Sequence, residues 1–193
     1  MRLSILNHGH GLATKALFSV IRMASGHPVL GIIKLVKYRA DFYGKPMGAV
    51  TQEAMRGPSA WSVADRELMA AVVAKSNTCA FCTEAHSSVA RQALGDSARV
   101  AAVLEDLETA PIDAPLRATL RMLKKLSTEH SVHAADMRAL LASGVSHAQI
   151  KDALAVSFAF NTVARLAEAF RFEMPTSGAM DAGAKFLLAR GYG

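Results

Sequence analysis

The chain has 193 residues, of which 51% are hydrophobic, 20% charged and 6% aromatic, and its net charge is +6. This length suits one domain with an extension, and the apolar content is enough for a sizeable core. No apolar run approaches the roughly 20 residues that span a bilayer, and two cysteines are too few for a secreted disulfide framework. Arg22 interrupts the apolar stretch at residues 16–21. We therefore expect no membrane span, no signal peptide and a cytoplasmic location.

The excess positive charge lies entirely in the first third of the chain. Residues 1–60 carry eight Lys and Arg against two Asp and Glu, whereas residues 61–193 carry fourteen of each sign. Such a segment can present an electropositive face to an acidic partner or an anionic surface, or it can simply be a solvated helix face. The basic residues are not interleaved with a motif that reads bases, so we expect no nucleic-acid partner.

Helices are expected throughout the chain. Ala, Leu, Val and Met dominate the composition, and no segment shows the period-two alternation of a strand, so the predicted fold class is all-α. Residues 1–10 are expected to be irregular. The helices that the apolar periodicity and the Gly and Pro positions predict cover about residues 12–23, 29–42, 47–55, 63–76, 79–94, 97–107, 114–127, 134–141, 147–172 and 179–193.

These elements divide into three expected segments. Residues 1–60 form a basic helical N-terminal extension, residues 61–172 a catalytic domain, and residues 173–193 a C-terminal tail with a short helix. Ser62 followed by Asp65 resembles a capping box at the start of the domain, and Ser146 followed by Gln149 is a second one. The short linkage after residue 76 predicts that the helices on either side of it form an antiparallel hairpin.

The first hairpin has a decayed second copy. A shift of 84 residues aligns residues 62–86 with 146–170 and gives nine identities in 25 positions, including Asn77-Thr78 with Asn161-Thr162. We interpret this as a duplicated helical hairpin, so the predicted bundle is built from two related hairpins. In the second copy the places of both cysteines and the following histidine hold apolar residues, which predicts a scaffold without chemistry. These residues are Val163, Leu166 and Phe170.

The chemistry is expected at Cys79, Cys82 and His86. Spacings of three and four residues place all three on one helix face near the helix N-terminus, which lowers a thiol's pKa. The two Cα atoms would lie about 5 Å apart, a separation that a disulfide tolerates. His86 can exchange a proton with Cys82. Glu67 lies as far before the hinge as His86 lies after it, so we expect its carboxylate to orient the imidazole.

Two other interpretations of the cysteines remain open at this point. Cys79, Cys82 and His86 with one remote ligand could bind zinc, although structural zinc needs four ligands. The cysteines could also be ordinary core residues. Thioredoxin-type chemistry is disfavoured, because there the C-x-x-C pair follows a β-strand.

The spacing of these four residues resembles the E-x(11)-C-x-x-C-x-x-x-H signature of alkylhydroperoxidase D (AhpD)-like proteins, which belong to the carboxymuconolactone decarboxylase superfamily. The resemblance covers roughly residues 60–172, and Phe160-Asn161 through Arg165-Leu166 also looks like the second half of the peroxidase-related members. The best-known members carry a second histidine between the cysteines. This chain has Phe81 there, as in peroxidase-related relatives with an aromatic residue.

The resemblance implies an all-α, homo-oligomeric cysteine peroxidase, often a trimer or hexamer. Cys82 would be the peroxidatic thiol and Cys79 the resolving thiol, with Glu67 and His86 as the proton relay. The implied substrate is an alkyl hydroperoxide. We expect no bound cofactor or metal, and the resemblance implies an external dithiol reductant, in the best-known members a protein-bound lipoyl group. The basic extension could help to receive such a lipoyl-bearing reductant protein.

Three alternative functions remain open. The same dithiol would serve a thiol–disulfide reductase without peroxidase turnover, or a redox-sensing helical module that never cycles. A decarboxylase or lactone-handling enzyme, like other superfamily members, works by acid–base chemistry and has no need of the C-x-x-C pair, so the sequence speaks against this third alternative.

Overall fold

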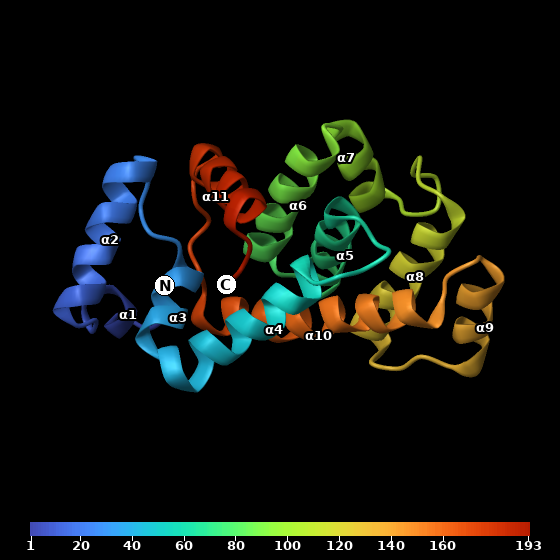
Figure 1. Ribbon diagram of the computed structural model, residues 1–193, viewed down its shortest axis with the longest axis horizontal. Coiled ribbons are helices and arrows are strands. Elements are labelled where there is room, and N and C mark those ends of the chain that lie inside the picture. The colour runs from blue at the N-terminus through green and yellow to red at the C-terminus, as the bar shows by residue number, and fades with distance from the viewer.

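A computed structural model describes all residues from 1 to 193, and it confirms the all-α fold. The chain forms eleven α-helices and one short π-helix, η1, and no strand (Figure 1). Their bounds are α1 Ile5–His8, α2 Leu12–Ser25, α3 Gly31–Tyr38, η1 Ala40–Gly44, α4 Lys45–Arg56, α5 Val63–Ser76, α6 Ala80–Leu94, α7 Ser97–Glu105, α8 Ala114–Glu129, α9 Ala134–Ala142, α10 His147–Phe170 and α11 Ser177–Arg190.

The long helix α10 runs along one side of the molecule, and α4 crosses it (Figure 1). Helix α5 packs against α6, α8 and α10, and the C-terminal α11 lies against α6. By length and composition alone, helix α10 could cross a membrane, but it contributes buried residues to the core along most of its length. Core helices of this kind satisfy the same measures.

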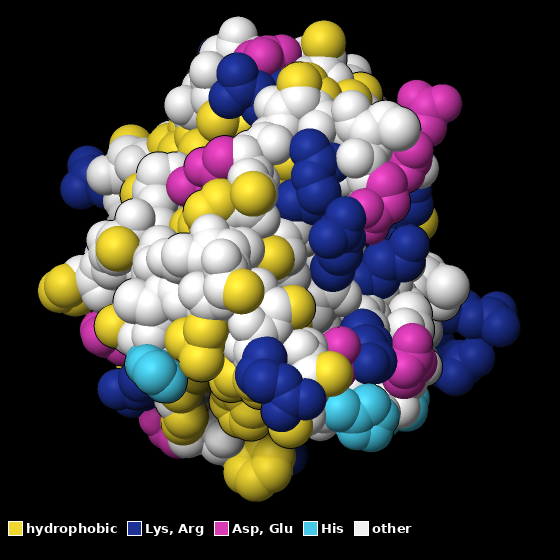
Figure 2. All heavy atoms as spheres, turned by 90° about the vertical axis from the view of Figure 1, so that its right-hand side faces the viewer, with side chains coloured by type: hydrophobic (Ala, Val, Ile, Leu, Met, Phe, Trp, Pro, Cys, Tyr) yellow, Lys and Arg dark blue, Asp and Glu magenta, His cyan; other side chains and the backbone are white.

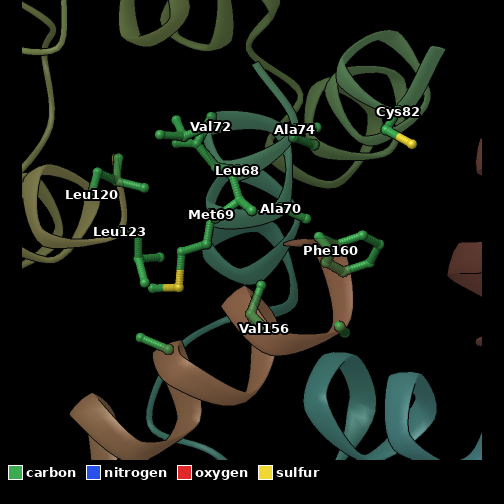
Figure 3. Packing of buried hydrophobic residues seen from close by; sticks show 14 of the residues in the cluster. Leu68, Met69, Ala70, Val72, Ala74, Cys82, Leu120, Leu123, Val156 and Phe160 are labelled. Carbon is green, nitrogen blue, oxygen red and sulfur yellow. The ribbon is translucent and has the colours of Figure 1, made fainter. Parts of the chain in front are cut away.

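The core forms around α5, which is buried on nearly all sides. Leu68, Met69 and Val72 of this helix pack with Leu123 of α8 and Val156 of α10 (Figure 3). A helix without a solvated face is held from every direction. Any side chain that α5 carries into the site is therefore fixed in position.

The hairpin of α5 and α6 forms as expected, with one difference at its turn. The Ser62 side chain accepts a hydrogen bond from the Asp65 backbone, and the Asp65 carboxylate accepts one from the Ser62 backbone, which confirms the capping box. The chain reverses at Thr78, which has a left-handed φ of 56°. Cys79 was expected to be the first helical residue, but it lies just before α6, where its own sulfur caps the helix.

The second copy of the repeat is not a hairpin, which corrects the prediction of two related hairpins. Helix α10 starts at the predicted capping box of Ser146 and Gln149 and continues without a break through Asn161 and Thr162. In the first copy a cysteine sulfur caps a new helix after the turn. Its counterpart Val163 has no side-chain atom that can cap a helix, and in the second copy α10 continues through this position and buries the side chain.

The N-terminal segment also differs in detail from the prediction. Residues 1–10 are not irregular throughout, because residues 5–8 form the short helix α1, which buries Leu6. The helix expected over residues 29–42 ends at Tyr38 and is followed by η1. Pro46 was expected to follow a helix end, but it lies in the first turn of α4, where proline lacks only a hydrogen bond that the helix would not make.

The balanced charge of residues 61–193 is visible at the end of the molecule formed by α8, α9 and the loop that precedes α8 (Figures 1 and 2). Figure 2 shows basic and acidic side chains beside one another on this face. Ion pairs join Arg121 to Glu108 and Lys125 to Asp136. The balanced charge of residues 61–193 is thus mixed at short range and gives no single-sign patch here.

Candidate functional site

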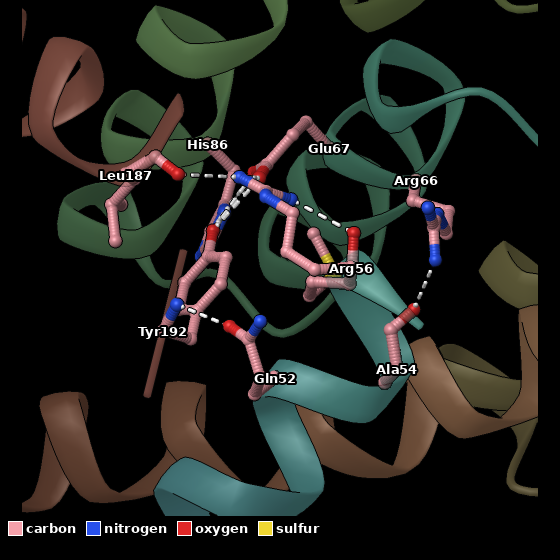
Figure 4. A network of polar contacts seen from close by, with 9 residues as sticks. Gln52, Ala54, Arg56, Arg66, Glu67, His86, Leu187 and Tyr192 are labelled. Carbon is pink, nitrogen blue, oxygen red and sulfur yellow. Dashed lines mark hydrogen bonds and ion pairs between the residues drawn. The ribbon is translucent and has the colours of Figure 1, made fainter. Parts of the chain in front are cut away.

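Glu67 lies at the centre of a buried polar cluster in which four helices and the C-terminal segment meet (Figure 4). Its side chain is fully buried. Oε2 lies 2.8 Å from Nδ1 of His86 on α6, and Oε1 accepts a hydrogen bond of 2.7 Å from Nη2 of Arg56 on α4. The hydroxyl of Tyr192 donates to both carboxylate oxygens, at 2.9 and 3.0 Å. The predicted contact between Glu67 and His86 is therefore confirmed.

These partners keep Glu67 ionised. Burial by itself would raise the pKa of this carboxyl group, but the hydrogen bond and charge of His86 and the charge of Arg56 outweigh it and lower the pKa below its ordinary value of 4.5. Arg56 is in turn held by the carbonyl oxygens of Met55, at 2.9 Å, and Leu187, at 3.1 Å. A buried carboxylate with this set of donors is fixed in orientation as well as charge.

The carboxylate also selects the tautomer of His86. An ionised carboxylate only accepts hydrogen bonds, so Nδ1 of the imidazole carries the proton that faces Oε2. Nε2 is then free to accept or return a proton on the other side of the ring. The edge of Phe160 on α10 packs at 4.1 Å between ring centroids and limits rotation of the imidazole. His86 is thus arranged as an oriented base.

Cys79 and Cys82 form a buried dithiol at the start of α6. Both are free cysteines, with 0% and 2% of their surface exposed. The backbone N–H of Cys82 donates to the sulfur of Cys79 at 3.4 Å. The hydrogen bond from the Cys82 thiol, and to a smaller extent this backbone donor, lower the pKa of Cys79. The same thiol–thiol hydrogen bond, followed by burial, raises the pKa of Cys82. In the reduced pair the negative charge is therefore favoured on Cys79 and the proton on Cys82.

His86 follows Cys82 by one helical turn, so the two side chains lie on the same side of α6. The chain thus places an oriented imidazole beside the cysteine that holds its proton more tightly. The arrangement can remove a proton from a thiol, hold it, and return it to a leaving group.

Three further side chains surround the dithiol. Phe81, which lies between the two cysteines in the sequence, packs edge-on against Phe172, at 5.5 Å between ring centroids. The hydroxyl of Tyr43 in η1 is buried without a hydrogen-bond partner, and burial, followed by the charge of Cys82, raises its pKa to about 12. The carboxylate of Glu168 on α10 is close enough to raise the pKa of both thiols.

No group of three or more His, Cys, Asp or Glu side chains is placed to hold a metal ion. Cys79, Cys82 and His86 therefore do not form a metal-ligand set in this structure. Two surface hollows of about 490 and 470 Å³ lie elsewhere, one over α8 and α10 and the other beside the outer face of the α6 N-terminus. Neither is lined by the dithiol or by Glu67.

The structure adds residues that the sequence analysis did not identify. Arg56 was counted as part of the basic extension, but its side chain is turned inward onto Glu67. Tyr192, in the expected tail, reaches the same carboxylate. Arg56 precedes Glu67 by eleven residues across a Gly-Pro break, and Tyr192 follows it by 125, so neither lies at a helical spacing. Residues from all three expected segments meet here, and the segment boundaries themselves stay a prediction.

Comparisons with known proteins were made for the sequence and for the fold. The sequence profile of the carboxymuconolactone decarboxylase family matches residues 43–125. A search of curated proteins finds no significant match. Among solved structures, an uncharacterized peroxidase-related protein from Silicibacter sp. TM1040 is similar, with a TM-score of 0.77 and 25% identity over 93% of each chain.

A second solved structure, from Ralstonia eutropha JMP134, is described as an alkylhydroperoxidase AhpD core and an uncharacterized peroxidase-related protein. It has a TM-score of 0.76 and 20% identity over 95% of this chain and 96% of its own. Both likenesses extend over more than nine tenths of this chain. The segment that the family profile matches includes Arg56, Glu67 and the dithiol, and it ends well before Tyr192.

Proposed function

Because the chain belongs to the carboxymuconolactone decarboxylase superfamily, among its AhpD-like members, we propose that it is a cysteine-based peroxidase that reduces alkyl hydroperoxides. The observation that carries the proposal is the buried 2.8 Å contact between Glu67 on α5 and His86 on α6, the helix that the dithiol begins. A buried Glu–His pair beside two free thiols is suited to proton transfer during sulfur chemistry.

In the first step His86 acts on Cys82. The Cys82 proton passes to Nε2 of His86, and Glu67 stabilises the imidazolium through Nδ1. The thiolate then attacks the outer oxygen of the hydroperoxide. The S–O bond forms as the O–O bond breaks, which leaves a sulfenic acid on Cys82 and an alkoxide. His86 returns its proton to the alkoxide, which departs as the alcohol.

In the second step Cys79 resolves the sulfenic acid. Its sulfur attacks that of Cys82, the S–S bond forms, and the hydroxyl group leaves as water with the remaining proton. The two cysteines are three residues apart at the helix start, so the bridge needs little backbone movement. An external dithiol then reduces the disulfide by exchange and becomes oxidised itself. Burial of both thiols favours a small or flexible reductant, such as a lipoyl group on a carrier protein.

Single cysteine variants test this order of events. Cys82→Ser should lose hydroperoxide turnover with dihydrolipoamide as donor, and Cys79→Ser should stop after one equivalent with a sulfenic acid on Cys82, detected by dimedone labelling and mass spectrometry. Because the pKa of Cys79 is lowered, the main alternative is the opposite order, in which Cys79 attacks the hydroperoxide and Cys82 resolves the sulfenic acid. If dimedone labels Cys79 in the Cys82→Ser variant and both variants lose turnover, then Cys79 is the peroxidatic thiol and Cys82 the resolving one.

Two measurements separate this activity from its alternatives. Turnover on a small disulfide that exceeds turnover on cumene hydroperoxide would identify a thiol–disulfide reductase. A disulfide that forms with peroxide and is reduced by no dithiol would identify a redox sensor. A homo-oligomer and a cytoplasmic location stay predictions, and light scattering of the purified protein tests the first.

A further inference from the structure

The C-terminal segment places a tyrosine directly on the Glu67–His86 pair. We infer that Tyr192 is a positioning residue that holds Glu67 in the orientation His86 needs, so that proton transfer at Cys82 depends on the end of the chain. This inference rests on the proposed function for its role in catalysis. The contacts that carry it are independent of any substrate.

Tyr192 contacts both members of the pair. Its hydroxyl lies 2.9 and 3.0 Å from the two oxygens of Glu67 and 3.4 Å from Nδ1 of His86. Its ring is stacked over the imidazole, with 6.3 Å between centroids and 23° between planes. A donor shared by two carboxylate oxygens resists rotation of the carboxylate about its last bond, and that rotation would break the contact between Oε2 and Nδ1.

The hydroxyl acts as a donor and not as a competing acid or base. Burial, followed by the charge of Glu67, raises the pKa of Tyr192 well above its ordinary value of 10. The phenol therefore keeps its proton at neutral pH and cannot take the one that His86 carries. A neutral donor fixes the geometry of the carboxylate while Arg56 balances its charge.

The end of the chain is built to deliver this side chain. The backbone N–H of Tyr192 donates to Oε1 of Gln52 on α4 at 2.6 Å, and the guanidinium of Arg56 lies 5.0 Å from the centre of its ring. Gly191 turns the chain after α11 with a φ of 72°, and a Cβ atom there would collide with the Gln52 side chain. Only glycine suits both requirements. These contacts lock the tyrosine against α4 (Figure 4).

The titratable and charged groups around the site define what a pH profile can report. Arg56 on α4 faces Glu67 and the ring of Tyr192. The dithiol is faced by Tyr43 from η1 and Glu168 from α10. Removal of the Tyr192 hydroxyl takes a donor from Glu67 and a 3.4 Å contact from Nδ1 of His86. The ion pair of Arg56 with Glu67 does not need this hydroxyl.

The experiment compares Tyr192→Phe with wild type and with Tyr38→Phe, which removes a hydroxyl from a distant and partly exposed ring. The readout is the rate of alkylation of the reduced dithiol by iodoacetamide between about pH 5 and pH 10. We expect Tyr192→Phe to react about fivefold more slowly at neutral pH, the effect of one lost hydrogen bond, with its profile displaced to higher pH. Tyr38→Phe should match wild type.

A second pair of variants shows whether Tyr192 acts through Glu67. Glu67→Gln is compared with the double variant Glu67→Gln/Tyr192→Phe. If the tyrosine acts through the carboxylate, its removal should change the alkylation rate less than twofold in this background. The same fivefold loss in both backgrounds, or no loss in either, overturns the inference.

This outcome is distinguishable from failure of the proposed function. If wild type consumes no hydroperoxide but the alkylation rates show the coupling, the positioning role holds and the peroxidase proposal falls. If hydroperoxide is consumed and the alkylation profile of Tyr192→Phe matches that of wild type, the peroxidase proposal holds and the role of Tyr192 falls. Melting temperatures of all variants separate either result from loss of folding.

Discussion

The side chain of Asn77 donates a hydrogen bond of 2.9 Å to the side-chain oxygen of Asn161, its counterpart in the repeat, 84 residues further along the chain. Asn77 also donates to the Val73 carbonyl oxygen, and Asn161 to that of Ser157. The two copies are therefore joined at equivalent positions, although one forms a turn there and the other continues as a helix.

The asparagine pair should be coupled energetically. We expect Asn77→Ala and Asn161→Ala each to lower the free energy of unfolding, and the double variant to lose about 1 kcal/mol less than the sum, because the shared hydrogen bond is counted twice. Urea unfolding of the four proteins gives the coupling. Strict additivity would show that the contact contributes nothing to stability.

Arg56 should matter for stability more than any exposed cation. Arg56→Met leaves the buried Glu67 carboxylate without its cationic partner, and we expect a loss of about 3–5 kcal/mol in the free energy of unfolding. Lys45→Met is the matched control, because its ion pair with Asp41 is almost fully solvated and should leave stability unchanged. Equal effects in the two variants would contradict a buried, ionised Glu67.

Glu67 should give the protein a specific sensitivity to acid. Its pKa in the folded chain lies below the ordinary value of 4.5, so its contribution to stability is fully present above that pH and is lost as the pH falls through the folded value. Glu67→Gln removes this titration. Between about pH 6 and pH 3, the free energy of unfolding of wild type should therefore fall more steeply than that of the variant. Parallel curves would show that Glu67 titrates alike in both states.

Glu168 should slow the reaction of the dithiol. Its negative charge acts to raise the pKa of both thiols, and at Cys79 it opposes the larger effect of the hydrogen bond from Cys82, which lowers the pKa. Glu168→Gln should therefore speed alkylation by iodoacetamide near neutral pH and displace the pH profile downward. Glu105→Gln, an exposed change on α7, should have no effect. A slower reaction in Glu168→Gln would mean that this carboxylate helps to remove the thiol proton.

Local signals predicted much of the fold and half of the polar cluster. Both serine capping boxes occur as expected, and the hairpin count that placed Glu67 beside His86 needed only helical geometry and a short turn. Such inferences succeed because their cause lies within a few turns of helix. The pairing of Cys79 with Cys82 could be predicted for the same reason.

The remaining features depend on contacts that no local pattern encodes. The same Asn-Thr dipeptide ends a helix at Thr78 and lies inside a continuous helix at Thr162. The two copies differ in the residue that follows the dipeptide and in how that residue packs. Arg56 was grouped with solvated cations because its formal charge is visible in the sequence and its burial is not. Tyr192 reaches the site through tertiary folding alone.

The enclosure of the dithiol has a kinetic consequence. With Cys79 fully buried and Cys82 only 2% exposed, a peroxide reaches sulfur only when the surrounding side chains open briefly. If Cys82 is oxidised as proposed, its partner sulfur is already in the same enclosure, and a second peroxide must wait for another opening. Disulfide formation then has the advantage over further oxidation, so the burial that slows the proposed reaction also protects the sulfur from irreversible damage.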